Sequence, residues 1–402
     1  MRQFAKSLAL FEEARRLIPG GSQTINKRPN PAVLGQTPIY VERAKGCRVW
    51  DVDGNEFIDY VQALGPITLG YGDPTVDAAV REQLDKGMLS GLLYPLEVEV
   101  AREVVDAVPC AEMVRFFKSG AEATSAAARI ARALTGREKI VHWGYHGWHD
   151  NWTVERNDGG VPKALASCLL SFRYNDLDSL RAAFDAHPND IAAVIMVATQ
   201  TTPPATGFLQ GVRQLCDARG ALLIFDEIVT GFRLARGGAQ EFFGVTPDLA
   251  CFAKGIANGM PLAAVVGKRE VMQIMERLII STTYGGEALS LAAARVCLQL
   301  YRNPEVFKHL WTMGERLMAG INAAAQAHGV PARCVGFAPM SLIEFHGDTP
   351  AETDHLWNTF LRETAQRGVL FRRGGLAFIT LAHAAEDIEQ TVAVCDEVFA
   401  NM

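Results

Sequence analysis

The spacing of apolar and polar positions divides this chain into three zones. Residues 1–65 begin with a helical pattern and a loop rich in Pro, Asn and Arg, followed by the stretch RVWDVDGNEFIDY. That stretch alternates apolar and polar positions on both sides of Asp53-Gly54, a turn signal between two strand-like runs. We therefore predict that the first zone holds a helix, a loop and a hairpin.

In residues 66–295, short apolar runs alternate with helical patterns. The runs are MVRFF (113–117), KIVHW (139–143), IAAVIMV (191–197), ALLIFD (221–226), LACFA (249–253) and LAAVVG (262–267). Strands of this kind, separated by helices, are typical of a parallel sheet that is covered on both faces. We predict an α/β domain with a mostly parallel sheet and with ligands at the carboxyl ends of its strands. Residues 296–402 mix helices and short strands, which predicts an α+β lobe.

Composition and charge exclude several classes of protein. The 402 residues are 49% hydrophobic and 21% charged, as is usual for a soluble globular protein. The formal net charge of -6 argues against a nucleic-acid partner, and no apolar run approaches the ~20 residues that span a bilayer. Eight scattered cysteines without a CxxC motif predict reduced, mostly buried thiols and a cytoplasmic location.

Two predicted strand ends carry groups that suit a ligand. ALLIFD ends at Asp226, at the edge where α/β sheets bind ligands, although such an acid also often caps the following turn. Glu227 should point to the opposite face, and we expect it to be structural. MVRFF leads into the helix start Ser119-Gly120-Ala121, whose free N–H groups suit an anion such as phosphate. A plain N-cap by Ser119 fits the same residues, and the sequence leaves both interpretations open.

Lys254 stands between the run LACFA and the glycine-rich turn GIANGMP. A lysine is usually a solvated surface residue, but this one follows a predicted strand. Pyridoxal phosphate requires an amine for its aldehyde, a carboxylate for its pyridine nitrogen and a cradle for its phosphate. Lys254, Asp226 and the helix start at 119–121 together predict a site for this cofactor.

The stretch HWGYHGWHD suggests a metal site through His142, His146 and His149. However, Gly144 and Gly147 disfavour a regular helix, so helical spacing of ligands does not follow. No further Cys/His cluster completes a site, and we expect no metal. An aromatic loop after a strand would instead suit stacking on a flat ligand.

With these residues in view, the chain resembles the class III pyridoxal-phosphate aminotransferases of fold type I, and among them the glutamate-1-semialdehyde 2,1-aminomutase-like enzymes. The matching stretches, in family order, are IYVERAKGCRVWDVDGNEFIDYV, MVRFFKSGAEATSAAARIARALTGREKIV, YHGWHD, LLIFDEIVTGFRLARGGAQEFFGVTPDLACFAKGIANGMPLAAVVG and LAHAAEDIEQTV. They cover nearly the whole chain. The resemblance implies a large cofactor-binding domain and a smaller α+β domain built from the N-terminal segment and the C-terminal region.

The resemblance assigns roles residue by residue. It makes Lys254 the lysine that forms the internal aldimine with the cofactor and later moves a proton, and Asp226 the partner of the pyridine nitrogen. The other cofactor-binding positions that it implies are Ser119, Gly120, Ala121 and Thr283 for the phosphate, and Tyr145 and Val229 for the two faces of the ring. The threonine in this family reaches the phosphate of the neighbouring subunit, which implies a homodimer with active sites at the interface.

The chain departs from the family pattern where the substrate is expected. Val197-Ala198 replace a frequent Glu-Pro pair, and Glu287 places an acid near the active-site entrance. Near the N-terminus, Thr24 and Lys27 align with the serine and arginine that hold the substrate carboxylate in the aminomutase, and Arg28 is adjacent. A lysine lacks the bidentate fork of arginine. The candidate substrate residues are Thr24, Lys27, Arg28, Trp148 and Glu287.

These observations predict a pyridoxal-phosphate aminotransferase that passes an amino group from a donor to a carbonyl acceptor through pyridoxamine phosphate. The main alternative is an aminomutase that moves nitrogen within one molecule. A decarboxylase or racemase on the same fold, and a non-catalytic cofactor-binding protein, also remain open. The sequence does not identify the donor, the acceptor or the stereochemistry.

Overall fold

A computed structural model describes residues 2–156 and 159–402, which form two compact units. Unit 1 comprises Met1–Asp73 with Lys308–Met402, and unit 2 comprises Pro74–Phe307. The two ends of the chain share unit 1 because a strand near the C-terminus pairs with one near the N-terminus: Val369 lies opposite Ile58 in a parallel ladder. The small α+β domain is thus built from both chain ends, as expected.

Unit 2 contains a seven-stranded sheet of order β4-β10-β9-β8-β7-β5-β6. Its strands are β4 Met113–Phe117, β5 Lys139–Trp143, β6 Leu169–Ser171, β7 Ile191–Met196, β8 Leu222–Asp226, β9 Leu249–Phe252 and β10 Ala263–Gly267. Neighbouring strands run parallel except at β10, which is antiparallel to β4 and β9. The mostly parallel sheet is confirmed, and only the three-residue β6 was not predicted, because so short a run shows no clear period.

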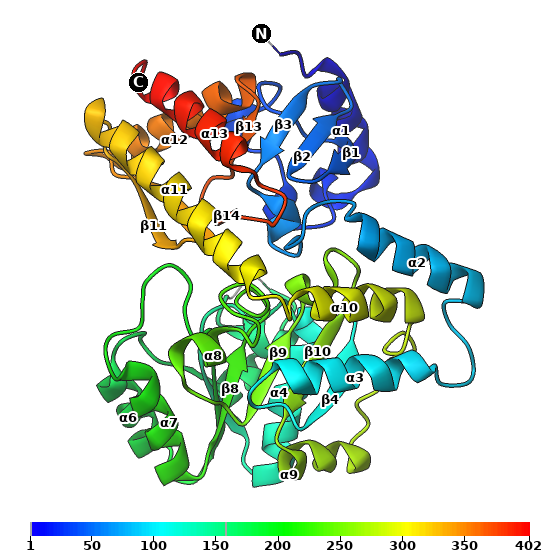
Figure 1. Cartoon of the computed structure of the whole chain (residues 1–402). Helices are drawn as coiled ribbons and strands as arrows, with labels where there is room; N and C mark the ends of the chain where they lie inside the picture. Colours follow the sequence, from blue (N-terminus) through cyan, green and yellow to red (C-terminus); the bar gives the residue numbers. More distant parts are fainter. Residues whose placement is uncertain (1, 157–158) are drawn as a thin grey trace. The chain divides into compact units, whose positions relative to one another are not determined.

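Helices cover the sheet of unit 2. They are α2 Pro74–Lys86, α3 Pro95–Ala107, α4 Gly120–Thr135, α5 Asp150–Thr153, α6 Leu177–Ala186, α7 Phe208–Arg219, α8 Ala239–Phe243, α9 Arg269–Met272 and α10 Ala288–Leu300. Every residue of β7 is buried, so both faces of the sheet are covered. Figure 1 shows α6 beside α7, and α3 beside α10. Helix α4 packs on the central strands through small side chains such as Ala123 and Ala127.

Unit 1 holds two small sheets, β1-β2-β3-β13 and β11-β12-β14. The strands are β1 Val41–Lys45, β2 Arg48–Asp51, β3 Glu56–Asp59, β11 Ala332–Phe337, β12 Met340–Phe345, β13 Val369–Leu370 and β14 Ala377–Phe378. The longer helices are α1 Ala5–Leu17, α12 Pro350–Gln366, α13 Ala385–Phe399 and most of α11 Glu305–Ala327. The predicted hairpin is present: β2 and β3 are antiparallel, and Gly54 takes a φ of 88° in the turn that joins them.

Two bulk predictions concern membranes and cysteines. Within residues 2–156 and 159–402, no helix is long and apolar enough to cross a bilayer. The cysteines are free, and all except the half-buried Cys168 are buried. Burial suits thiols as small apolar side chains, but the Cys47 thiol also donates to Asp387 Oδ2 over 3.3 Å.

Candidate active site

The two central candidates leave neighbouring strands at the same edge of the sheet. Strands β8 and β9 are parallel, with Asp226 opposite Cys251. The N–H of Glu227 donates to the Cys251 carbonyl over 2.8 Å, which holds the two strand ends in register. Lys254 follows β9 by two residues. Topology therefore brings an amine and a carboxylate to one strand edge, although they are far apart in the sequence.

Lys254 occupies an unusual backbone position. Its φ is 46°, in the left-handed region that lysine rarely adopts, and it begins the short 3-10 turn Lys254–Ala257. Its side chain is half-buried. Burial lowers the pKa of Lys254 from 10.5 to about 8, assisted by the positive charge of Arg233 and opposed by the nearby Asp226. The strained backbone and the lowered pKa are typical of functional sites.

Asp226 is buried and holds two hydrogen bonds. The N–H of Ile228 donates to its Oδ1 over 3.1 Å, and the Nδ1 of His146 lies 2.7 Å from its Oδ2. His146 is also buried, and its Nε2 has no hydrogen-bond partner among the described residues. The sequence offered His146 only as a metal ligand, and the structure makes it the partner of Asp226. Its place in an aromatic loop after a strand was the only local signal.

The loop that carries His146 also contacts the start of α4. Gly147 has a φ of 119°, and a Cβ at this position would lie 2.6 Å from the Cβ of Ala121. The hydroxyl of Thr124 donates to the His146 carbonyl over 2.6 Å. Only glycine permits this approach, so the histidine loop and the candidate phosphate cradle form one packed assembly.

The start of α4 confirms the N-cap by Ser119, and the anion site at Gly120 and Ala121 stays a prediction. Ser119 is its N-cap, because its hydroxyl accepts from the Glu122 N–H at 3.3 Å while the Glu122 carboxylate accepts from the Ser119 N–H at 2.8 Å. The N–H groups of Gly120 and Ala121 have no partner among the described residues. A Cβ at Gly120 would lie 2.5 Å from the Ile228 Cδ1. The cap therefore leaves two donors for an anion.

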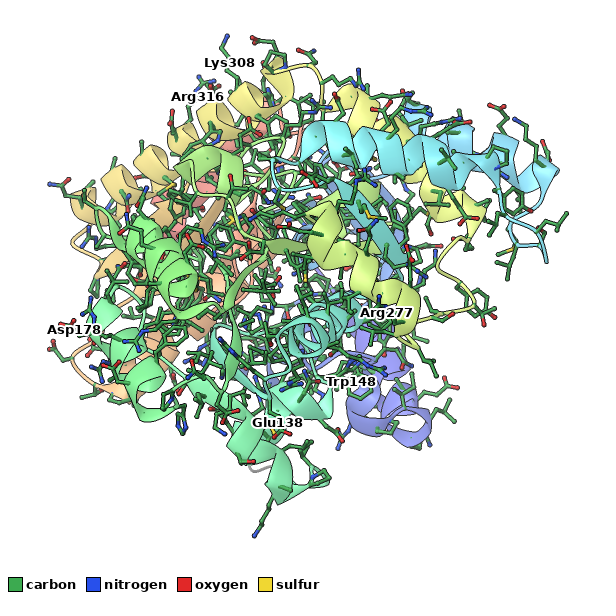
Figure 2. The ribbon with its side chains drawn as sticks, turned by 90° about the horizontal axis from the view of Figure 1, so that it is seen from below. Glu138, Trp148, Asp178, Arg277, Lys308 and Arg316 are labelled. Carbon is green, nitrogen blue, oxygen red and sulfur yellow. The ribbon has the colours of Figure 1, made fainter. Side chains whose placement is uncertain are left out.

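The aromatic candidates lie at the surface of unit 2. Tyr145 is 57% exposed, and the guanidinium of Arg156 lies 5.5 Å from its ring centre. Trp148, labelled in Figure 2, is 71% exposed and makes an edge contact with His149. Val229 is half-buried just beyond β8. Their expected contacts with the cofactor ring or substrate stay predictions.

Glu287 and Thr283 have contrasting surroundings. Glu287 is buried at the N-cap of α10, where its Oε1 accepts from the Leu289 N–H over 2.7 Å. Burial opposes its ionisation, but hydrogen bonds from Ser290 and Lys118 lower the pKa of Glu287 below its usual value. Thr283 is exposed and lines a cavity of ≈ 540 Å³. These contacts show a structural task for Glu287, and its expected role at the substrate entrance stays a prediction.

The N-terminal substrate candidates belong to unit 1. Thr24 is half-buried, whereas Lys27 and Arg28 are exposed on and after the short 3-10 helix Ile25–Lys27. Lys27 and Arg28 line a cavity of ≈ 820 Å³ in this unit, together with Arg372. Arg372 donates to the Asn26 side chain over 2.9 Å. The sequence did not single out Arg372, which follows the two-residue strand β13. The substrate roles of these residues stay predictions.

Within residues 2–156 and 159–402, no three His, Cys, Asp or Glu side chains are grouped so that they could hold a metal ion. The histidines of the aromatic loop have other partners. His142 Nε2 lies 3.1 Å from Glu155, and His149 Nδ1 lies 2.9 Å from the Ser125 hydroxyl. The imidazoles of His142 and His149 therefore take part in hydrogen bonds.

The combination of a mostly parallel sheet, a lysine, a buried carboxylate and an open helix start is typical of the pyridoxal-phosphate enzymes of fold type I. Comparison with known proteins shows the family. Residues 31–392 match the model of the class III aminotransferases. The chain is 37% identical to 3-aminobutyryl-CoA aminotransferase of Cloacimonas acidaminovorans over 408 residues, which cover 100% of this chain and 98% of that protein. It is 38% identical to a glutamate-1-semialdehyde 2,1-aminomutase of Syntrophobacter fumaroxidans over 426 residues, 99% of this chain and 98% of that protein.

Solved structures agree. The pyridoxal-phosphate form of the FumI protein of Sphingopyxis sp. MTA144 has a TM-score of 0.91 and 31% identity, covering 99% of this chain and 96% of that one. An omega-transaminase from Sphaerobacter thermophilus has a TM-score of 0.91 and 27% identity, covering 98% and 97%. This chain belongs to the class III aminotransferases and is a pyridoxal-phosphate-dependent enzyme.

The residues of unit 2 fit this cofactor. The free N–H groups at the start of α4 suit its phosphate, the buried Asp226 suits its pyridine nitrogen, and Lys254 supplies an amine with a lowered pKa. Glycines keep the cradle open, since side chains at Gly120 or Gly147 would collide with their neighbours. The polar groups of the site and the room that its glycines leave both suit pyridoxal phosphate.

Proposed function

We propose that this protein is an aminotransferase that moves an amino group from an amino donor to a separate carbonyl acceptor in two half-reactions. The observation that carries the proposal is the placement of Lys254 and the buried Asp226 on adjacent strand ends, with the pKa of Lys254 lowered to about 8. Relatives that are aminotransferases by name support it.

Each residue has a definite task in this proposal. Bound pyridoxal phosphate supplies an aldehyde that takes up amines and a ring that accepts electrons. Lys254 would hold the cofactor through its amine and would act as the base that moves the proton of the substrate carbon. Asp226, fixed by His146, keeps a proton on the pyridine nitrogen. Gly120 and Ala121 hold the phosphate through their N–H groups.

Covalent trapping tests the role of Lys254. Reduction with sodium borohydride should fix the cofactor on the peptide that contains Lys254, as seen by mass spectrometry. Lys254→Ala should abolish both the trapping and turnover. An unrelated lysine of the same unit, Lys86, is exposed on α2, and Lys86→Ala should change neither. Trapping at another lysine would contradict the proposal.

An aminomutase is the second candidate, favoured by the 38% identity to a glutamate-1-semialdehyde aminomutase over nearly the whole chain. The two functions differ in their need for an acceptor. A transaminase that has consumed an amino donor stays in its pyridoxamine form until a carbonyl acceptor is added. A mutase completes its cycle with a single substrate. A panel of donors and acceptors, followed by absorbance, separates the two functions.

We also propose that the enzyme is a cytoplasmic homodimer with Thr283 at the interface. Large apolar side chains are exposed beside the cavity that Thr283 lines: Leu92 is 83% and Leu93 85% exposed. Large exposed apolar patches on a protein usually mark a surface that binds a partner. A second copy of the chain would bury this patch. The free cysteines support the cytoplasmic location.

A further inference from the structure

An ion pair between the half-buried Lys118 and the buried Glu287 joins two segments of the candidate cofactor site. Lys118 Nζ lies 2.9 Å from Glu287 Oε2, with 19% and 8% of the two side chains exposed. Most other ion pairs of unit 2, such as Lys86–Glu82 on α2, are far more exposed. An exposed ion pair contributes little to the stability of the fold. Removing one partner of a buried pair is costly, because it leaves an uncompensated buried charge. The Lys118–Glu287 pair therefore constrains the fold around it.

Lys118 connects the N-termini of two helices. Its backbone N–H donates to the Glu122 carboxylate over 3.0 Å, which is the capping carboxylate of α4. Its ammonium reaches Glu287, the N-cap of α10, whose carboxylate also accepts from the Leu289 and Ser290 N–H groups. One lysine thus fixes the start of α4 relative to the start of α10.

The segment before α10 depends on the same anchor. Thr283 is exposed, and the turn around it closes onto Glu287, whose N–H donates to the Tyr284 carbonyl over 3.1 Å. The Gly285 N–H donates to the Thr282 carbonyl over 3.2 Å. The backbone at Glu287 is therefore tied to the turn that carries Thr283.

We propose that the Lys118–Glu287 ion pair positions the phosphate-binding groups of this enzyme. It would hold the N–H donors of Gly120 and Ala121 on one side and the Thr283 segment on the other. Both residues are positioning residues, and the inference rests on the proposed cofactor site.

The test compares pyridoxal phosphate with pyridoxal, which lacks the phosphate, by titrating the cofactor-free protein. Lys118→Met and Glu287→Gln should each weaken binding of pyridoxal phosphate by about tenfold and leave pyridoxal binding unchanged. The double variant should cost no more than either single change, because the two residues act as one unit. Lys86→Met, which removes the exposed pair with Glu82, serves as the control and should alter neither affinity.

Two results would overturn the inference: equal weakening of both compounds, which would indicate a general loss of structure, and unchanged affinity for both. Glu287→Gln retains a side-chain oxygen for the N-cap of α10, so it supplies the comparison even where Lys118→Met does not fold. Failure of the unaltered protein to bind pyridoxal phosphate would instead refute the proposed function itself.

Discussion

The imidazole of His146 lies against the carboxylate of Asp226, with 2.7 Å between Nδ1 and Oδ2 and only 2% and 3% of the two residues exposed. The histidine comes from the loop after β5 and the aspartate from the end of β8. A charge-assisted hydrogen bond of this kind fixes the orientation of the carboxylate. His146 therefore fixes the Asp226 carboxylate, which is the expected partner of the pyridine nitrogen.

Removing this imidazole should weaken cofactor binding more than it destabilises the fold. We expect His146→Ala to weaken pyridoxal-phosphate binding about tenfold and to slow the amino-donor half-reaction by at least as much, since a charged hydrogen bond is worth ~1.5–3 kcal/mol. Stopped-flow absorbance measures the half-reaction. His149→Ala, which changes a half-buried histidine of the same loop, is the matched control. An unchanged half-reaction in His146→Ala would show that Asp226 needs no such partner.

The lowered pKa of Lys254 predicts how the stability of the cofactor-free protein depends on pH. Its pKa is about 8 in the folded protein and 10.5 in the absence of burial. Between these values the unfolded chain binds more protons, so the free energy of unfolding should rise with pH, by at most ~1.4 kcal/mol per pH unit. The penalty for burying the charged amine is present below pH 8 and is relieved toward 10.5. Lys254→Met should flatten this slope in denaturant titrations, and an identical slope would contradict the assignment.

The absence of a side chain at Gly120 should matter for the phosphate cradle. Gly120→Ala would bring a Cβ to within 2.5 Å of the Ile228 Cδ1. We expect weaker binding of pyridoxal phosphate, by about tenfold, because the start of α4 must shift. Ile228→Val removes that Cδ1, and adding it to Gly120→Ala should restore part of the affinity. No recovery in the double variant would mean that the loss has another cause.

A charge placed in the exposed apolar patch of unit 2 should disrupt the proposed homodimer. Leu93→Lys should shift the protein toward monomers in analytical ultracentrifugation, because a lysine buried in an apolar interface must be desolvated. Cofactor affinity should fall with it if Thr283 serves the partner subunit's site. Leu134→Lys, at an exposed position in the last turn of α4, provides the control. A dimer that survives Leu93→Lys would place the interface elsewhere.

Local patterns were sufficient for most elements of unit 2. The apolar runs became strands at nearly the predicted bounds, because burial on both faces of a sheet demands continuous apolar side chains. The capping signal at Ser119 also held, since Glu122 completes the box within one turn of helix. The short strand β6 was not predicted, because three residues show no period and depend on their neighbours for pairing.

The sequence by itself determined the class of this enzyme, through a lysine, an aspartate and a helix start that each follow an apolar strand. Tertiary structure decided which polar groups meet. His146 and Asp226 are 80 residues apart, and Lys118 and Glu287 are 169 apart. Hydrophobic periodicity is written in neighbouring residues, but a hydrogen bond between distant side chains exists only once the order of strands places their ends together. In this sheet β7 lies between β5 and β8. The three strands are parallel, so the loops that follow β5 and β8 leave the same edge of the sheet.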